Sequence, residues 1–311
     1  MARRMFSRKR MTKKASLEPV PLPAFIAWST IAALILLGGL QELGRFQPAL
    51  DTKFGILLIG LILSGGLVSI AIFKFARRRS ADAPAADRAK RPERILGAEI
   101  QAWWISVLYP LENYLARKQW NPNYITALSF GFNLIGCVFL FSGWLFLAGM
   151  VILLGGTLDI LDGRIARKTG TVSSRGAFFD SVMDRYSEIL IFLGLAAHFR
   201  DSILFYVILL GLGGSLMVSY TRARAEGLGI TCKVGMMQRP ERVVFLGFGA
   251  MFSSILHMLR GTLGLDAGPY LMGFILFVIA ILSNATAFSR MVYVMRQLQD
   301  QHGADRKKAQ P

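Results

Sequence analysis

Four aspartates in a short stretch between two apolar runs are the residues of this 311-residue chain best suited to chemistry. Asp159 and Asp162 are three residues apart, and Asp180 and Asp184 are four apart, so each pair shares one face if its segment is helical. Two such faces turned toward each other would form a cage of hard oxygen donors, which suits Mg²⁺, Mn²⁺ or Ca²⁺. The alternative is a set of helix ends solvated among lipid headgroups. It is disfavoured because acids inside a membrane are costly and usually functional.

The segment between the two pairs is rich in groups that bind anions. Residues 163–176 hold three arginines, a lysine and two serines, and we expect them to form a short cytoplasmic loop. Arg167 can bind a phosphate through two parallel hydrogen bonds, which a lysine cannot do. Gly163 and Gly176 carry no side chain and let a ligand approach the backbone. Carboxylates for a metal beside arginines for phosphate indicate phosphoryl-transfer chemistry.

The composition predicts that these residues are carried by helices that lie in a membrane. The chain is 53% hydrophobic, only 18% charged, and has a positive mean hydropathy. These values are typical of an all-α, polytopic membrane protein. We expect eight apolar spans: Phe25–Leu43, Phe54–Phe75, Tyr124–Phe141, Trp144–Leu161, Ala177–Ala197, Ile203–Tyr220, Val243–Leu259 and Tyr270–Ser289.

The distribution of basic residues predicts the orientation in the membrane. With these spans, 30 of the 36 lysines and arginines fall in segments on one side of the membrane. By the positive-inside rule that side is cytoplasmic, so both termini and the aspartates face the cytoplasm of a cell-membrane protein. A net charge of +17 on a soluble protein would suggest nucleic acid as a partner. Its position beside the membrane argues against that partner.

Changes in composition divide the chain into five parts. We expect a basic tail at 1–23, a two-helix transmembrane hairpin at 24–75, a basic linker at 76–94, a catalytic domain at 95–296 and a basic tail at 297–311. The domain begins with a partly amphipathic segment, residues 95–117, that contains Trp103 and Trp104. Paired tryptophans suit a helix lying in the headgroup plane, and Pro110 should kink or break it.

A second group of arginines borders the membrane at the level of the aspartates. Arg222 and Arg224 follow the sixth span, Arg239 and Arg242 begin the seventh, and Arg290 closes the eighth. The positive-inside rule alone would explain any one of them. Together they favour a second anion pocket.

The aspartate stretch identifies the chain as similar to a known family. Asp-x-x-Asp-Gly-x-x-Ala-Arg, eight residues, then Gly-x-x-x-Asp-x-x-x-Asp resembles the signature of the CDP-alcohol phosphotransferases at every fixed position. The resemblance covers roughly residues 96–295. It implies a six-helix core, usually dimeric, in which a CDP-linked lipid such as CDP-diacylglycerol donates a phosphatidyl group to an alcohol and CMP is released.

The resemblance also implies roles for individual residues. Asp159, Asp162 and Asp180 would be metal ligands for Mg²⁺ or Mn²⁺, two ions in each site. Asp184 would be the general base for the acceptor hydroxyl and could also touch the second metal. The residues at the CDP-lipid-binding positions are Asn123, Thr126, Gly163, Ala166, Arg167, Ser173 and Gly176.

The second arginine group bears on the choice of acceptor. Ser-Tyr-x-Arg-Ala-Arg-Ala-Glu at 219–226 and Arg-Pro-Glu-Arg at 239–242 resemble the phosphatidylinositol phosphate synthases, whose acceptor is inositol phosphate. A phosphorylated polyol would explain why Arg222, Arg224 and Arg290 gather near the metals. Phosphatidylglycerophosphate synthase is the alternative, because glycerol phosphate needs the same pocket. A divalent-cation transporter is disfavoured because the outer halves of the aspartate-bearing spans are apolar, and an inactive scaffold because all four aspartates are present.

Overall fold

The computed structural model of this protein describes residues 60, 64–71, 98–260 and 264–308. All the regular structure among these residues is helical, which confirms the predicted all-α class. The helices, in chain order, are α3 (Ala98–Arg117), α4 (Pro122–Phe141), α5 (Leu145–Thr169), α6 (Ser174–His198), α7 (Leu204–Gly227), α8 (Arg239–Met258) and α10 (Gly268–Lys308). The predicted first tail, first span and linker lie outside the described residues. Of the second predicted span, residues 60 and 64–71 are described and are helical.

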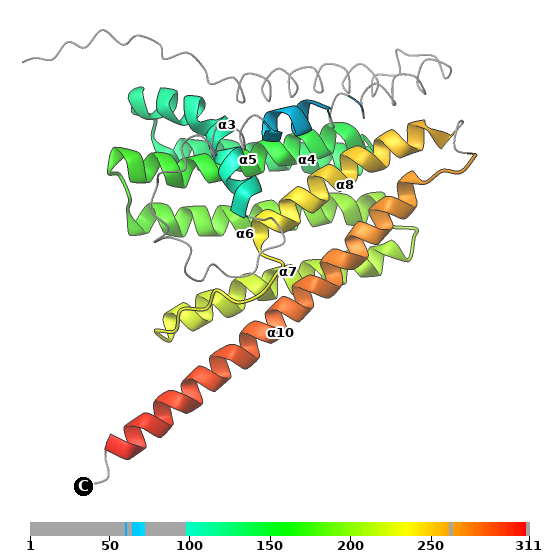
Figure 1. Ribbon diagram of the computed structural model, residues 1–311. Coiled ribbons are helices and arrows are strands. Elements are labelled where there is room, and N and C mark those ends of the chain that lie inside the picture. Colours follow the sequence, from blue (N-terminus) through cyan, green and yellow to red (C-terminus); the bar gives the residue numbers. More distant parts are fainter. Residues whose placement is uncertain (1–59, 61–63, 72–97, 261–263, 309–311) are drawn as a thin grey trace, which may run out of the picture.

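The six helices α4 to α8 and α10 form one packed bundle (Figure 1). Helix α4 packs against α5 and α6, α5 also contacts α8, α6 contacts α7, and both α7 and α8 contact α10. A buried apolar cluster joins all six of these helices, and its members include Leu140, Ile152, Phe192, Ile208, Leu246 and Ile279. Helices α4 and α6 approach closely at Gly194, where an added Cβ would lie 2.7 Å from the carbonyl oxygen of Cys137.

Four of the described helices are long and apolar enough to cross a membrane: α4, α5, α7 and the part of α10 up to Gln301. Helices α6 and α8 were also predicted as spans, and at 25 and 20 residues they are long enough for a hydrocarbon core about 30 Å thick. Ionisable residues, most of them in the first half of each helix, make α6 and α8 less apolar than the other four spans. Several of these side chains pair with one another inside the bundle, as intramembrane charges normally do. The chain is a multi-pass membrane protein.

A short turn between α5 and α6 brings the two aspartate pairs to the same level. Gly170 ends α5 in the left-handed conformation, with φ of 71°, and Ser173 caps α6 by accepting a hydrogen bond from the Gly176 N–H at 3.1 Å. The predicted loop at 163–176 is therefore largely helical, and only residues 170–173 connect the helices. The antiparallel turn sets the end of α5 beside the start of α6.

Helix α3 supports α5 from outside the bundle. It continues through Pro110 without ending, and its axis changes direction along its length (Figure 1). Leu108 and Leu115 are buried in a cluster with Leu161 and Ile165 of α5. Trp103 donates a hydrogen bond of 3.0 Å to the hydroxyl of Ser69, which ties α3 to the helical segment at 64–71. The position of α3 in the headgroup plane stays a prediction.

Helix α10 is much longer than the predicted eighth span. It runs for 41 residues and includes most of the segment predicted as a basic tail. Tyr293, Val294 and Leu298 lie beyond the predicted span and pack against a buried cluster of Ile230 and Cys232 in the connection between α7 and α8. This packing gives the extension of α10 a role in holding that connection.

Candidate active site

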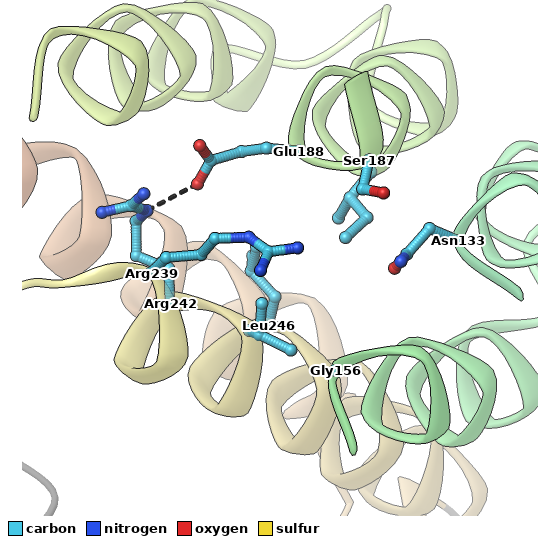
Figure 2. Close-up of a pocket in the computed structure, with 9 residues that line it drawn as sticks. Asn133, Gly156, Ser187, Glu188, Arg239, Arg242 and Leu246 are labelled. Carbon is cyan, nitrogen blue, oxygen red and sulfur yellow. Dashed lines mark hydrogen bonds and ion pairs between the residues drawn. The ribbon is translucent and has the colours of Figure 1, made fainter. Parts of the chain in front are cut away.

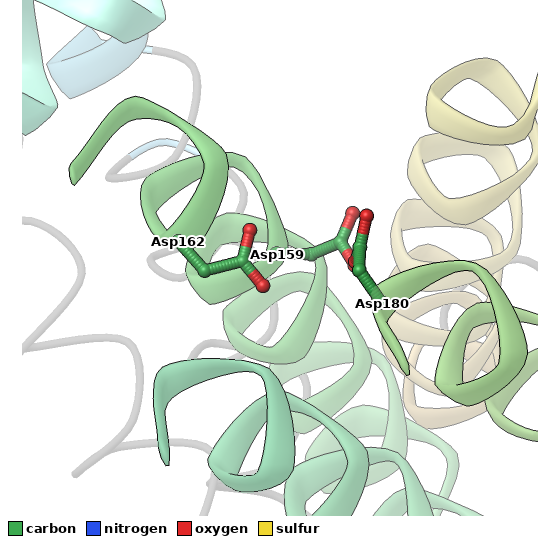
Figure 3. A group of neighbouring side chains, drawn as sticks. All are labelled: Asp159, Asp162 and Asp180. Atoms are coloured by element: carbon green, nitrogen blue, oxygen red, sulfur yellow. The ribbon is translucent and has the colours of Figure 1, made fainter. Parts of the chain in front are cut away.

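Three of the four aspartates form a compact group where α5 meets α6 (Figure 3). One carboxylate oxygen from each of Asp159, Asp162 and Asp180 lies within 4.8 Å of the others. The first two come from one face of α5 and the third from the facing side of α6, which is the arrangement expected from their spacing. Three hard oxygen donors at this separation fit Mg²⁺ or Mn²⁺. Among the described residues this is the group suited to hold a metal ion.

Asp162 is the most enclosed of these carboxylates and is oriented by a residue of α4. Its side chain is 4% exposed and accepts hydrogen bonds of 2.5 Å from the Thr126 hydroxyl and 2.5 Å from the Gly163 N–H. Thr126 was expected at a CDP-lipid-binding position. In the structure its hydroxyl contacts the proposed metal ligand itself.

Asp184 lies beside the group of three and is held by an arginine. Nη1 of Arg239 is 2.5 Å from Oδ2 of Asp159 and 2.8 Å from Oδ1 of Asp184. All three side chains are about one-fifth exposed, so the arginine bridges the two helices at the mouth of the site. The sequence grouped Arg239 with a separate acceptor pocket. In the structure α8 packs against α5 and brings Arg239 to the aspartates, and its role in binding the acceptor stays a prediction.

The residues at the expected CDP-lipid positions form two neighbouring groups. An added Cβ on Gly176 would lie 3.1 Å from Oγ of Ser173 and 3.4 Å from Oδ1 of Asn123, so these three residues from two helices adjoin one another. An added Cβ on Gly163 would lie 3.5 Å from Nη1 of Arg167. Ala166 is one residue before Arg167 on α5 and is half-buried. Neither glycine carries a side chain, so we expect a ligand to approach the backbone between these groups.

An acidic residue of α3 distinguishes Arg167 from the basic residues around it. Glu112 is 5% exposed and makes ion pairs of 2.7 Å with Arg164 and 3.3 Å with Lys168. Arg167 is exposed and has no ion pair within the described part of the chain. The four side chains line an open cavity of about 280 Å³. Glu112 thus engages two of the cations, and Arg167 is left available for an anion. Sequence reasoning missed this, because Glu112 is 52 residues from Arg164.

The five arginines predicted to bind the acceptor's phosphate differ in their burial and in their partners. Arg222 and Arg224 are exposed at the end of α7, where Arg222 pairs with Glu226 at 2.9 Å. Arg290 is 3% exposed and donates to the backbone carbonyls of Val234 at 2.9 Å and Val218 at 2.6 Å.

Arg242 has an environment unlike that of an anion-binding surface residue. Its side chain is fully buried and paired with Glu188. Burial and the ion pair place Arg242 in the bundle interior, and its contact with the acceptor stays a prediction.

The geometry of the metal-binding group and a sequence comparison together assign this protein to a family. The sequence model of the CDP-alcohol phosphatidyltransferase family matches residues 119–283, and the chain belongs to that family. The protein is therefore a membrane-embedded transferase, as its aspartate motif indicates.

Individual members of the family show which enzymes this chain resembles in sequence and structure. The archaetidylinositol phosphate synthase of Methanothermobacter thermautotrophicus is 36% identical over 157 residues, which cover 50% of this chain and 74% of the relative. The phosphatidylinositol phosphate synthase of Streptomyces avermitilis is 31% identical over 69% of this chain and 90% of its own length. The crystal structure of the Mycobacterium tuberculosis phosphatidylinositol phosphate synthase with CDP-DAG bound matches with a TM-score of 0.53 and 29% identity, over 60% of this chain and 92% of that one. A second structure of that protein contains manganese and citrate and has a TM-score of 0.52, with 29% identity over 60% of this chain and 88% of that one.

Proposed function

We propose that this enzyme transfers the phosphatidyl group of CDP-diacylglycerol to inositol phosphate and releases CMP. The observation that carries the proposal is the product named for the relatives. Their names differ in the lipid, archaetidyl in one and phosphatidyl in another, but agree on inositol phosphate. The arginine-rich motif at 219–226 favours the same acceptor.

The metal would be held by Asp159, Asp162 and Asp180, as two Mg²⁺ or Mn²⁺ ions in each site. Bound there, it would neutralise the pyrophosphate of the donor and stabilise the departing CMP. Asp184 would accept the proton of the acceptor hydroxyl and could also contact the second ion. Arg239 fixes the direction of this carboxylate through the 2.8 Å ion pair.

The donor and the acceptor would be bound by two different groups of residues. Asn123, Ser173 and Gly176 would receive the CDP moiety, with Arg167 on its phosphates. Arg222 and Arg224 would bind the phosphate of the acceptor. Arg290 would stabilise their position, because it donates hydrogen bonds to backbone carbonyls of α7 and of the connection between α7 and α8. We further propose that the site opens to the cytoplasm and that the enzyme is a homodimer, as the family resemblance and the basic side of the chain suggest.

The acceptor is tested with purified protein in detergent, CDP-diacylglycerol and three alternative acceptors, by following CMP release. We expect turnover with inositol phosphate and little with free inositol. Hydrogen bonds to charged groups are worth roughly 1.5–3 kcal/mol each, so losing two at about 1.4 kcal/mol per decade lowers turnover on the order of a hundredfold or more. Comparable turnover with free inositol would contradict the phosphorylated acceptor. Preference for glycerol phosphate would assign the enzyme to phosphatidylglycerophosphate synthesis.

The role of the aspartates is tested separately from the acceptor. Asp180→Asn keeps the shape of the side chain and removes its charge, and it should abolish CMP release with every acceptor. Chelation of divalent ions should do the same in the unchanged protein. Full activity in either case would reject the metal mechanism.

A further inference from the structure

The acidic face of α6 continues inward past the two aspartates. Asp180, Asp184 and Glu188 are spaced four residues apart, so all three lie along one side of the helix. Glu188 is 6% exposed and belongs to no part of the family motif described above. On the facing helix α8, Arg239 and Arg242 are three residues apart and also share a side. The two helices therefore meet through two ion pairs, one at the site and one deeper in the bundle.

The deeper pair joins more of the molecule than α6 and α8. Nε of Arg242 is 2.7 Å from Oε1 of Glu188, and the same oxygen accepts a hydrogen bond from the hydroxyl of Ser215 on α7. Nη1 of Arg242 donates to the carbonyl of Met237, just before α8 begins, at 3.1 Å. Figure 2 shows the ion pair of Glu188 and Arg242 on one side of a small cavity and Asn133 on the other side. This pair thus fixes the start of α8 relative to α6 and α7.

The composition of this pair suggests a function other than stability. Burying two charges is costly, and well-packed apolar side chains of similar volume often stabilise a protein as well or better. In addition, Nη2 of Arg242 is buried without a hydrogen-bond partner in the described part of the chain. An arrangement selected for stability alone would not leave this donor unsatisfied. An ion pair fixes the position of a helix along its axis and its rotation about that axis. Apolar contacts do so less strictly.

We propose that Glu188 and Arg242 form a positioning pair that sets Arg239 against Asp159 and Asp184. Arg242 is one turn from Arg239, so its anchoring to α6 determines where along the bundle the Arg239 guanidinium lies. Without that anchor, α8 could shift along its axis while its apolar face stayed packed. Arg239 would then lose its shared contact with the two carboxylates. The proposal rests on the roles proposed above for these aspartates.

The test replaces both members of the pair by apolar residues, Glu188→Met with Arg242→Met. CMP release is measured with CDP-diacylglycerol and whichever acceptor the unchanged enzyme uses, together with thermal unfolding in detergent. We expect a midpoint equal to or above that of the unchanged protein. We also expect kcat to fall about 10- to 100-fold, since a misplacement of about 1 Å can cost a hundredfold. The KM for the CDP-lipid should stay the same, because Asn123, Ser173 and Gly176 belong to α4 and the start of α6 and not to α8.

A mutant cycle separates positioning from a general structural role. Arg239→Met should lower kcat in the unchanged protein but have less than about a twofold further effect in the paired variant, because the two changes act through one contact. Ser253→Ala is the matched control: this buried residue of α8 bonds the Gly268 carbonyl at 2.7 Å, far from the aspartates along the helix, and its loss should leave kcat unchanged.

The outcomes decide the proposal in either direction. A folded paired variant with kcat within about twofold of the unchanged enzyme would overturn it, and so would additive losses in the cycle with Arg239→Met. If the paired variant does not fold, the same cycle is run on Glu188→Gln, which removes the charge of the pair and keeps the size of the side chain; kcat within about twofold of the unchanged enzyme, or losses additive with Arg239→Met, would again overturn the proposal. If the proposed acceptor is wrong, the unchanged enzyme will make a different product. That result can be distinguished from a failure of the positioning proposal, which concerns only the variants.

Discussion

Replacing Thr126 by valine should weaken metal binding without touching any carboxylate. The hydroxyl of Thr126 has one proton and two acceptors within reach, Oδ2 of Asp162 at 2.5 Å and the Pro122 carbonyl at 3.2 Å. The shorter contact indicates that the proton points to Asp162. Valine has nearly the same shape, so Thr126→Val removes this hydrogen bond and leaves the packing of α4 on α5 in place.

The size of the effect follows from the burial of both partners. Each side chain is 4% exposed, so water does not replace the lost donor. A hydrogen bond to a charged group is worth roughly 1.5–3 kcal/mol, and about 1.4 kcal/mol corresponds to one decade in an equilibrium constant. Binding of Mn²⁺ should therefore weaken about 10- to 100-fold, which is the range usual for residues that orient a metal ligand.

The assay is a titration of purified protein with Mn²⁺, in which free ion is measured by electron paramagnetic resonance. Thr157→Val is the matched control, because the Thr157 hydroxyl bonds the Leu153 carbonyl of its own helix at 2.8 Å. It should leave the affinity unchanged. If Thr126→Val binds Mn²⁺ within about twofold of the unchanged protein and instead raises the KM for the CDP-lipid, the reasoning is refuted. Thr126 would then be the donor-binding residue that the sequence predicts.

Three further changes have distinct expected results. Gly176→Ala introduces a Cβ 3.1 Å from Oγ of Ser173 and should raise the KM for the CDP-lipid severalfold, while thermal unfolding stays unchanged or improves because alanine favours a helix by about 1 kcal/mol. Glu112→Gln removes the charge that holds Arg164 and should lower the unfolding midpoint by about 2–4 °C, the shift expected for about 1 kcal/mol. A protein that begins near Ile95 should still release CMP, because the predicted chemistry lies after that residue.

Each of these expectations has an outcome that would contradict it. An unchanged donor KM in Gly176→Ala would mean that the ligand does not approach that backbone. An unchanged midpoint in Glu112→Gln would show that the contacts between α3 and α5 depend on apolar packing alone. Complete loss of activity in a well-folded protein lacking the first residues would show that they contribute to the site.

The sequence by itself determined the membrane class and the composition of the metal group. The spacings of Asp159, Asp162, Asp180 and Asp184 are local, and helical geometry converts them directly into two shared faces. Long apolar runs in the same way predicted the helices that carry them. The helical extension of α10 beyond the eighth span was missed, because its polar residues resemble a tail and its partner, the connection before α8, is far away in sequence.

Only the tertiary structure decided the surroundings of the aspartates. By sequence, Arg239, Arg242 and Arg290 are equivalent basic residues at the edge of the membrane. Packing separates them: one bridges two carboxylates, one is buried against Glu188, and one holds backbone carbonyls. Thr126 and Arg239 reach the aspartates of α5 from 36 and 80 residues away. Such contacts depend on how the helices are placed against one another, and no local spacing contains that information.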